Sequence, residues 1–458
     1  MSVLTALIKR FTAPSLPNPT EAYDQKYFDK FNSILRLYFN QLDQLLGQLV
    51  SGTTAVPITF PINTLDAFGR LVTTQPYTLF DSQNRYAADD QFDTGLTGGG
   101  TTSFLSNESS VQLNVGTASG DQVVRQSFRT MPYQPGKGLT FLATFVMASP
   151  KANLRQRVGY FSTRDGAFLQ QDGTTVSFVL RSSSLPTPGT PSDIRTIPQA
   201  DWNVDKMDGT GPSGRVLDLT KNQILYMDFE WLGTGDVRCG FYVDGSPQIC
   251  HIFHNDNTQT AVYMQTAILP VRYEITNTST TGSSSAMKQV CSSVINMGGY
   301  QQTTADHLAR RTAVLSTIGN TFLPLVSIRL NAAALGAVVL PNKIQVLPTT
   351  SQNYEVALVK NPTLTGASWV SVPSDPNVQY DVSSTAVSGG TLVYNNYTTA
   401  SGSGGSNVLN DSPGYKWDLQ LGASIAGVSD VYTVQIRTVS GATTGDAFGT
   451  FTFYDLTI

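Results

Sequence analysis

In the stretch Leu225–Leu232, LYMDFEWL, apolar and polar side chains alternate as far as Trp231. Side chains of a β-strand point alternately to opposite faces of the sheet, so this stretch predicts a strand with one apolar face and one polar face. Such a strand belongs to an antiparallel sheet that covers a core on one side. The apolar face would hold Leu225, Met227, Phe229 and Trp231, and the polar face Tyr226, Asp228 and Glu230.

Turn signals on the C-terminal side extend this strand into hairpins. Gly233–Asp236 predicts a turn into a return strand, and the dipeptide Asp244-Gly245 predicts a two-residue hairpin turn after that. Counting outward from Asp244-Gly245 places Cys239 opposite Cys250 on a hydrogen-bonded pair, which orients side chains poorly for a disulfide. We therefore expect two free, mostly buried thiols, and three Cys in the chain predict no disulfide framework.

Short β-branched and aromatic runs, broken by Gly, Pro, Asn and Ser-Thr clusters, follow one another from Val56 to the end of the sequence. They predict a mainly β chain with two antiparallel β-sandwich domains of jelly-roll or lectin-like type. The predicted units are an N-terminal helix (1–56), a first sandwich with an extended connector (57–304), a linker with a short helix at Ala305–Leu315 (305–324) and a second sandwich (325–458). Further predicted strands lie at 111–115, 122–128, 139–147, 157–161, 176–180, 261–269, 272–277, 287–294, 325–330, 337–340, 344–347, 354–359, 391–394, 416–421, 431–439 and 448–456, and a flexible loop at 94–102.

A seven-residue apolar repeat occupies the segment before the β region. No polar residue interrupts its two seam positions, and about three heptads of this kind predict a helix that pairs with copies of itself. Thr20 would cap the helix and Gly52 would close it. The predicted oligomerisation residues are Phe28, Phe31, Leu35, Tyr38, Leu42, Leu45 and Leu49.

Two alternatives remain for this helix. An amphipathic helix that lies on its own β domain would show a similar apolar stripe. If the helix does self-associate, apolar Phe39 and Leu46 beside the seam widen the stripe, which favours three strands over two. A homotrimer is therefore the expected assembly.

Composition restricts the partners. Charged residues make up 14% of the sequence and the net charge is −4, so no excess of Lys and Arg predicts nucleic-acid binding. Met1–Arg10 lacks the charge order of a secretory signal, and the apolar run Ala332–Leu340 is about half the length needed to cross a bilayer. We expect a protein made in a cytoplasm, without membrane insertion.

Two carboxylates stand two residues apart on the polar strand face, with aromatic residues beside them. Asp228 and Glu230 would lie about 7 Å apart, a separation compatible with an inverting glycosidase or with cation binding. Tyr226 on the same strand and Tyr242 across the hairpin would complete a possible glycan-binding face. The alternative is a solvated strand face that carries its ordinary polar residues.

No segment predicts a metal site, a cofactor or a catalytic centre. Cys250 and His251 would point to opposite faces of a strand, and His254 adds no second ligand pair at zinc-like spacing. The acidic loop Asp201–Gly209 lacks the ligand order of an EF-hand, which favours a structural loop pinned by Trp202. His307 lies near no Ser or Cys nucleophile in the sequence, and no nucleophile elbow is present.

Five segments of the chain carry a resemblance to a known family. They are Tyr23–Val50 (YDQKYFDKFNSILRLYFNQLDQLLGQLV), Asp66–Leu71 (DAFGRL), Tyr77–Tyr86 (YTLFDSQNRY), Gln199–Gly214 (QADWNVDKMDGTGPSG) and Trp231–Phe241 (WLGTGDVRCGF). These segments resemble virion structural proteins of tailed bacteriophages, especially phages of marine and freshwater cyanobacteria. The similarity covers Thr20 to about Tyr300 and is weaker from Leu325 to Ile458. It carries no catalytic residue with it.

This resemblance implies a non-enzymatic component of a virion, a trimeric fibre or spike on tail or capsid that serves particle architecture and host-surface attachment. Its partners would be copies of itself, other virion proteins and possible host surface glycans. The alternatives are a carbohydrate-binding or glycan-cleaving sandwich protein, and a capsid decoration protein without a receptor role.

Overall fold

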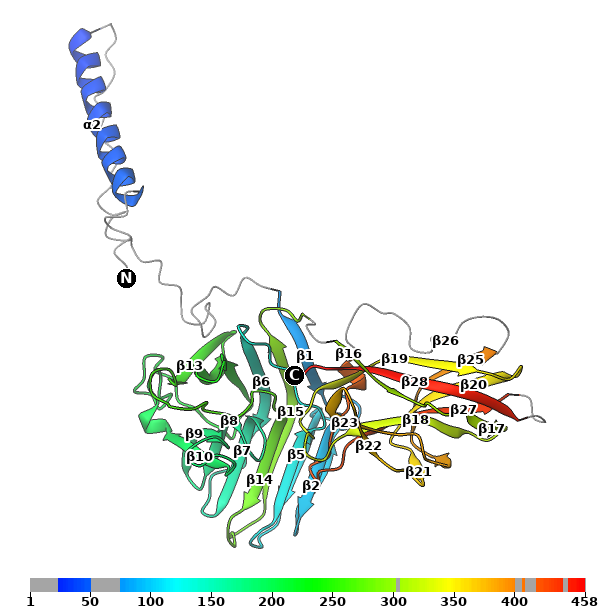
Figure 1. The fold of residues 1–458 in the computed structure, drawn as a ribbon. Helices are drawn as coiled ribbons and strands as arrows, with labels where there is room; N and C mark the ends of the chain where they lie inside the picture. The colour runs from blue at the N-terminus through cyan, green and yellow to red at the C-terminus, as the bar shows by residue number, and fades with distance from the viewer. Residues whose placement is uncertain are drawn as a thin grey trace. The chain divides into compact units, whose positions relative to one another are not determined.

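The computed structural model describes residues 24–50, 75–301, 305–399, 406–407, 417–439 and 444–457, with the backbone alone for 41–50 and 406–407. Residues 1–61 and 62–458 form separate compact units. In the described part of the chain, no helix combines the length and apolar character that a membrane span requires. The mainly β character predicted from the sequence is confirmed (Figure 1).

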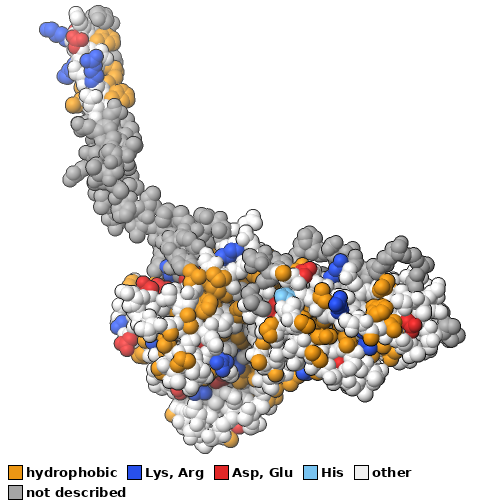
Figure 2. Space-filling view, in the orientation of Figure 1, with side chains coloured by type: hydrophobic (Ala, Val, Ile, Leu, Met, Phe, Trp, Pro, Cys, Tyr) orange, Lys and Arg blue, Asp and Glu red, His pale blue; other side chains and the backbone are white. Residues whose placement is uncertain are grey.

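Helix α2 (Gln25–Val50) occupies the segment with the apolar repeat. Asp24 caps it, because its carboxylate accepts from the Lys26 N–H at 2.9 Å and its carbonyl from the Phe28 N–H at 3.2 Å. The predicted cap Thr20 and the closing Gly52 lie outside the described residues. Figure 2 shows hydrophobic side chains gathered along one side of this helix.

The predicted seam residues are not buried where their side chains are described. Phe28 is 43% exposed, and Phe31, Leu35 and Tyr38 are half-buried. The side chains of Leu42, Leu45 and Leu49 lie outside the described residues. The single helix is consistent with the sequence, and the coiled coil and the trimer stay predictions.

The first sandwich consists of two facing antiparallel sheets (Figure 1). Sheet I contains, in spatial order, β13 (Ser246–Phe253), β12 (Val237–Val243), β11 (Gln223–Phe229), β6 (Leu139–Val146), β15 (Ser285–Asn296), β4 (Ser110–Val115) and β3 (Thr101–Leu105), and β1 (Tyr77–Gln83) also pairs with β15. Sheet II contains β10 (Ser192–Pro198), β9 (Thr175–Ser182), β8 (Gly166–Asp172), β7 (Leu154–Phe161), β14 (Val271–Asn277), β5 (Gln122–Ser127) and β2 (Phe92–Thr97).

Aromatic side chains from both sheets fill the space between them. The Tyr160 ring of sheet II lies 5.3 Å from the Phe229 ring and 6.1 Å from the Phe141 ring of sheet I. All three side chains are fully buried, and rings at these separations add to the stability that their burial provides. The alternation of apolar residues along β11 thus places Phe229 in the core, as the sequence predicts.

The second sandwich follows the same plan. Its apolar core is separate from that of the first sandwich and includes Tyr354, Tyr432 and Phe451. Sheet III contains β16 (Asp306–Arg310), β28 (Gly445–Asp455), β19 (Val339–Pro348) and β26 (Ser406–Asn407), with β17 (Leu315–Ile318) paired to β28. Sheet IV contains β22 (Val370–Val372), β23 (Asp375–Asp381), β18 (Leu323–Leu330), β27 (Val431–Thr438), β20 (Asn353–Lys360) and β25 (Thr391–Thr399), and β21 (Thr363–Thr365) pairs with β24 (Ala386–Ser388).

Hydrogen bonds connect the two sandwiches. The Arg129 guanidinium donates to the Trp417 carbonyl at 2.6 Å, and the Trp417 indole N–H donates to the Tyr77 hydroxyl at 2.8 Å. The Ala423 N–H donates to the Phe128 carbonyl at 3.0 Å. Because main-chain and buried groups take part, the loop around Trp417 joins the second sandwich to the first as one packed body.

Several predicted elements differ from the structure. The helix expected at Ala305–Leu315 is wrong, because Asp306–Arg310 forms strand β16, which pairs with β28. The predicted linker 305–324 thus contributes β16 and β17 to sheet III. The expected strand 261–269 is irregular apart from a bridge between Leu269 and Met131. Two further differences are a 3₁₀ turn, η3 (Trp417–Leu419), in place of the strand 416–421, and strand pairing by β2 and β3 within the loop expected at 94–102.

The predicted hairpin at Asp244-Gly245 is confirmed, but its register changes farther out. Val243 pairs with Ser246 and Tyr242 with Pro247, as expected. A bulge then shifts the ladder, so Cys239 faces His251 rather than Cys250. Both Cys239 and Cys250 are free and buried, as predicted, and the third, Cys291, is free and exposed.

Candidate aromatic pocket

The predicted glycan face on β11 is closed to solvent at its carboxylates. Tyr226 and Tyr242 do lie near each other, with ring centroids 6.4 Å apart. However, Asp228 is 2% exposed and Glu230 0% exposed, so the expectation of a solvated strand face is wrong for both. Cross-strand pairing sets Asp228 opposite the buried Arg238, an arrangement that offsets the cost of burying a carboxylate. A glycan cannot reach these two carboxylates.

The end of β11 instead positions an aromatic residue at a pocket. Glu230 turns inward beside Gly138, where an added Cβ would lie 3.0 Å from its Oε1 atom. Trp231, the next residue in the alternation, lies on the opposite side and is half-buried. Leu232 then adopts a left-handed backbone conformation, φ 37°, and its N–H donates to the Tyr133 hydroxyl at 3.3 Å. This bond ties the turn after β11 to Tyr133.

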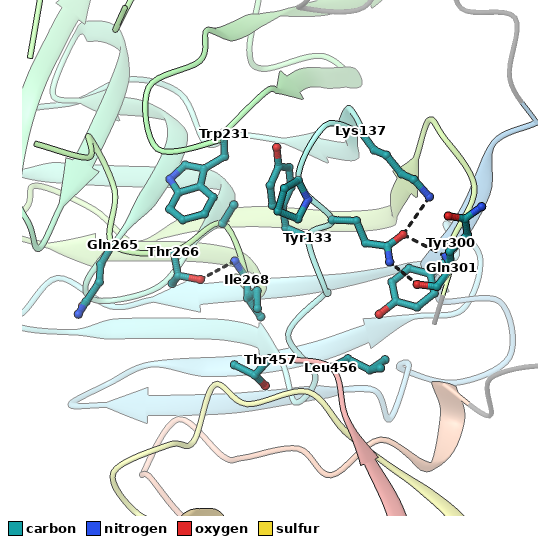
Figure 3. Close-up of a pocket in the computed structure, with 13 residues that line it drawn as sticks. Tyr133, Lys137, Trp231, Gln265, Thr266, Ile268, Tyr300, Gln301, Leu456 and Thr457 are labelled. Carbon is teal, nitrogen blue, oxygen red and sulfur yellow. Dashed lines mark hydrogen bonds between the residues drawn. The ribbon is translucent and has the colours of Figure 1, made fainter. Parts of the chain in front are cut away.

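We call the cavity at this place the aromatic pocket. Its volume is about 510 Å³, within the range of small-molecule sites. Figure 3 shows Trp231, Gln265 and Thr266 on one side, Tyr300, Gln301 and Lys137 on the other, and Leu456 and Thr457 across from them. The lining residues are Tyr133, Gln134, Pro135, Lys137, Trp231, Gln265, Thr266, Ala267, Ile268, Tyr300, Gln301, Leu456 and Thr457.

Fixed hydrogen bonds hold the aromatic side chains in place. The Tyr133 and Trp231 rings meet edge to face, 5.7 Å apart at 90°, and the indole N–H donates to the Met264 carbonyl at 3.2 Å. Tyr300 meets Trp417 edge to face at 5.2 Å, so the loop that joins the sandwiches also supports this ring. Burial raises the pKa of Tyr133 to about 12, with a smaller contribution from the Glu230 charge. Tyr133 is therefore a neutral hydroxyl at ordinary pH.

Amides and one lysine provide the polar part of the pocket. The Lys137 ammonium donates to the Gln134 side-chain oxygen at 3.0 Å and to the Gly299 carbonyl at 2.8 Å. The Gln301 N–H donates to the same Gln134 oxygen at 3.1 Å, and the Gln134 amide donates to the Gln301 carbonyl. The described lining residues include no Asp or Glu. The pocket can therefore bind an uncharged polar molecule by aromatic contact and hydrogen bonds to amides.

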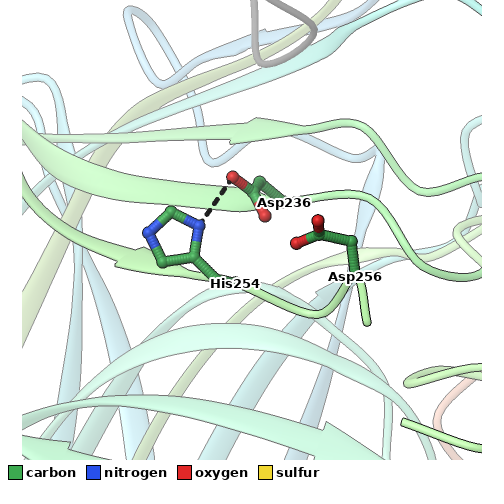
Figure 4. Close-up of side chains that lie close together, drawn as sticks. All are labelled: Asp236, His254 and Asp256. Carbon is green, nitrogen blue, oxygen red and sulfur yellow. Dashed lines mark hydrogen bonds and ion pairs between the residues drawn. The ribbon is translucent and has the colours of Figure 1, made fainter. Parts of the chain in front are cut away.

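A second group of side chains lies where β12 begins and β13 ends. Asp236, His254 and Asp256 hold possible ligand atoms within 4.8 Å of one another (Figure 4). The His254 Nδ1 atom is already hydrogen-bonded to Asp236 at 2.9 Å, and His254 is 59% exposed. Three partly solvated groups fall short of a complete coordination sphere, so we describe them as an exposed hydrogen-bonded pair with a neighbouring carboxylate. The sequence pattern did not predict that Asp236 and Asp256 lie close to His254.

The other histidines and the acidic loop have structural surroundings. His251 is 6% exposed and receives the Asn203 N–H at 3.4 Å, and burial lowers its pKa to about 4, with smaller contributions from Arg195 and His254. In the loop Asp201–Gly209, Trp202 packs on Phe178 at 4.5 Å, which confirms the predicted structural role.

His307 does have a hydroxyl neighbour that its sequence position did not reveal. The Ser374 Oγ atom lies 3.3 Å from His307 Nδ1. The His307 ring also stacks on the apolar ring of Phe453, with ring centroids 5.8 Å apart. Strand pairing in sheet III and the β22–β23 turn bring these two residues together although they are distant in the sequence.

Comparisons with known proteins find likeness in structure alone. No protein-family model matches the sequence. No curated protein sequence matches it either. The carbohydrate recognition domain of Emp47p is 9% identical with a TM-score of 0.32, over 48% of this chain and 97% of that one. A structure from work on endo-acting O-glycanases of the human gut microbiota is 10% identical with a TM-score of 0.32, over 48% and 99%. The carbohydrate esterase vb_24B_21 of the Shiga toxin-encoding bacteriophage phi24B is 11% identical with a TM-score of 0.27, over 48% and 99%.

Proposed function

We propose that this protein binds carbohydrate through the aromatic pocket and does not cleave it. The observation that carries the proposal is the convergence of Tyr133, Trp231 and Tyr300 on one cavity. Amides, hydroxyls and Lys137 also line this cavity, together with the apolar Pro135, Ala267, Ile268 and Leu456. Sugars present apolar C–H faces together with many hydroxyl groups. Aromatic rings pack against the C–H faces. Side-chain amides, which both donate and accept hydrogen bonds, bind the hydroxyl groups.

The arrangement of the pocket supports selective binding of a small polar ligand. Trp231 and Tyr133 are held by hydrogen bonds to the main chain, so little side-chain freedom is lost when a ligand enters. Gln265, Gln301 and Thr457 are exposed at its rim, where their polar groups can exchange water for sugar hydroxyls.

The positions of the carboxylates support binding without glycoside hydrolysis. Glycoside hydrolysis uses a pair of Asp or Glu residues on either side of the bond to be broken. The candidate pair Asp228 and Glu230 is buried, and the described residues of the pocket provide no other pair. We therefore infer that the chain holds its ligand and releases it unchanged.

We further place this binding activity on a tailed-phage particle, where the protein would attach the virion to a host surface glycan. This part of the proposal relies on the resemblance of Tyr23–Val50 and the other quoted segments to virion proteins, and on the apolar repeat of α2. The protein would be made in the host cytoplasm, assemble as a homotrimer through α2 and join other virion proteins.

A glycan array probed with the full chain tests the proposal. We expect a restricted set of glycans to be retained by the unchanged protein and lost by Trp231→Ala. Trp369→Ala is the matched control, because Trp369 is also half-buried but lies outside the pocket, against Arg329. Release of new reducing ends from any retained glycan would contradict the non-catalytic part, and absence of retention would contradict the binding part.

A further inference from the structure

A second cavity, which we call the inter-sandwich groove, lies between the outer face of sheet II and loops of the second sandwich. Its volume is about 660 Å³. The first sandwich contributes polar side chains, among them Gln126, Arg164 and Arg272, and the second contributes an apolar wall that includes Leu335 and Ile425. Cavities between domains are common ligand sites, and this one combines a polar wall with an apolar wall.

Two arginines bring positive charge to the groove. Arg164, in the turn between β7 and β8, is exposed, and its guanidinium donates to the neutral Gln265 side chain at 3.3 Å. Arg164 forms no ion pair within the part of the chain that the structure describes. Arg272 is 7% exposed and donates to the Gln126 side-chain oxygen at 2.7 Å. Guanidinium groups are the preferred partners of carboxylate and sulfate-like oxygens.

The carboxylates near the groove are already engaged inside the protein. Asp165 is 1% exposed and accepts from the Ser183 N–H at 2.9 Å, the Ser183 hydroxyl at 2.7 Å and the Gln265 N–H at 3.0 Å. Asp93 accepts from the Thr94 N–H at 2.8 Å and from the Ile425 N–H at 2.7 Å. With these oxygens occupied, the groove presents mainly donors to a ligand.

The sheet behind the groove strengthens this donor character. Arg155, Arg157 and Arg272 all lie within ion-pair distance of the single buried carboxylate of Glu274, at 3.6, 3.4 and 3.1 Å. The Arg157 guanidinium covers the Phe168 ring at 5.1 Å, and the Arg272 guanidinium covers the Phe161 ring at 5.6 Å. Packing of this kind fixes the guanidinium planes, so an incoming anion meets donors that are already oriented.

The groove and the aromatic pocket share a wall. Gln265, Thr266 and Ile268 line both cavities, and Gln265 accepts the bond from Arg164. A single chain of sugars could therefore contact both sites across this segment. An uncharged sugar suits the aromatic pocket, whereas a charged substituent suits the arginines.

We propose that the inter-sandwich groove binds the carboxylate or sulfate group of an acidic glycan, with Arg164 and Arg272 as its charge contacts. This inference deepens the proposed carbohydrate binding and depends on it. It predicts that the natural ligand is an anionic oligosaccharide. Nucleic acid is the other anionic polymer to test, and the groove favours sugars because the described lining offers Phe128 as its one aromatic ring for base stacking.

The test uses the full chain on an array of sialylated, uronic-acid and sulfated glycans, each beside its neutral counterpart. We expect retained glycans to be acidic and Arg164→Gln to lower their apparent affinity by roughly tenfold or more, since a charged hydrogen bond is lost. Arg310→Gln is the matched control, because Arg310 is exposed on β16, away from both cavities. Arg164 is exposed, so its replacement leaves folding intact, and a thermal melt checks this.

The possible outcomes separate this inference from the proposed function. Equal retention of neutral and acidic glycans, lost in Trp231→Ala but unchanged in Arg164→Gln, would overturn the inference and leave carbohydrate binding in place. Retention of no glycan would overturn both. Binding of an oligothymidylate that Arg164→Gln abolishes, without retention of acidic glycans, would overturn the inference in favour of nucleic acid.

Discussion

The Tyr133 ring stands edge-on to the indole of Trp231, with ring centroids 5.7 Å apart and planes at 90°. Tyr133 comes from the segment before β6, and Trp231 lies just beyond Glu230, the residue that follows β11. The pairing of β11 with β6 in sheet I brings these two segments together. The hydrogen bond from the Leu232 N–H to the Tyr133 hydroxyl then fixes the geometry. The pocket is therefore a product of sheet register and can be tested by changing single atoms in it.

Replacement of Tyr133 by Phe removes only the hydroxyl that receives the Leu232 N–H. We expect the free energy of unfolding to fall by about 1 kcal/mol, because a main-chain donor loses its protein partner. Chemical denaturation of the full chain measures this. Tyr86→Phe is the control, since Tyr86 is 84% exposed and its replacement should leave stability unchanged. A Tyr133→Phe protein as stable as the parent would show that this bond does not hold the turn.

Stability at alkaline pH should depend on the same tyrosine. Burial raises the pKa of Tyr133 from 10.0 to about 12, so in this interval the unfolded side chain ionises while the folded one stays protonated. The contribution of Tyr133 to the free energy of unfolding is therefore fully present below pH 10 and is lost as the pH rises toward 12. Tyr133→Phe should show a shallower decline than the parent in denaturation curves recorded across this range. Identical slopes would contradict the assigned environment of Tyr133.

Acid stability should depend on His251 in the opposite direction. Burial lowers the pKa of this imidazole from 6.5 to about 4, so the unfolded state takes up its proton first as the pH falls. The contribution is fully present above pH 6.5 and is lost as the pH falls through 4. We expect His251→Gln to flatten the pH dependence of unfolding in this window. A parental profile in His251→Gln would contradict the prediction.

Helix α2 should determine the oligomeric state. If the apolar repeat forms a trimeric coiled coil, a chain that begins at Pro57 should be monomeric, and Leu35→Glu in the full chain should weaken the assembly by placing charge in the seam. Light scattering or native mass spectrometry measures both masses. Ser33→Glu, at an exposed position of the same helix outside the apolar stripe, is the control. A full-length monomer would contradict the self-association proposed for α2.

Much of the architecture could be predicted because it depends on local patterns. Alternation placed Met227 and Phe229 in the core, and Asp244-Gly245 placed a hairpin where the structure has one. The helix prediction for Ala305–Leu315 failed because the apolar pattern of this segment is ambiguous between helix and strand. Pairing with β28 makes Asp306–Arg310 a strand. Cys239 and Cys250 are equally far from the turn in the sequence, and this spacing gave no indication of the bulge that shifts their register.

The candidate site was less predictable because it depends on contacts between distant residues. Alternation alone assigns Asp228 and Glu230 to an outer face but cannot say whether other groups cover that face, and both are buried. Tyr133 and Tyr300 lie far apart in the sequence and meet at one pocket only in the folded chain. Trp231 did give a signal, since it ends the alternating stretch directly before a glycine turn, but its partners could not be named.

Isothermal titration of the full chain with a glycan retained on the array, compared with Trp231→Ala and Trp369→Ala, tests the central claim most directly. We predict that Trp231→Ala lowers the affinity by roughly tenfold or more, because an aromatic contact at the centre of a binding site contributes about 2 kcal/mol or more. Trp369→Ala should bind like the parent. Unchanged affinity in Trp231→Ala, with both variants folded, would contradict carbohydrate binding by the aromatic pocket.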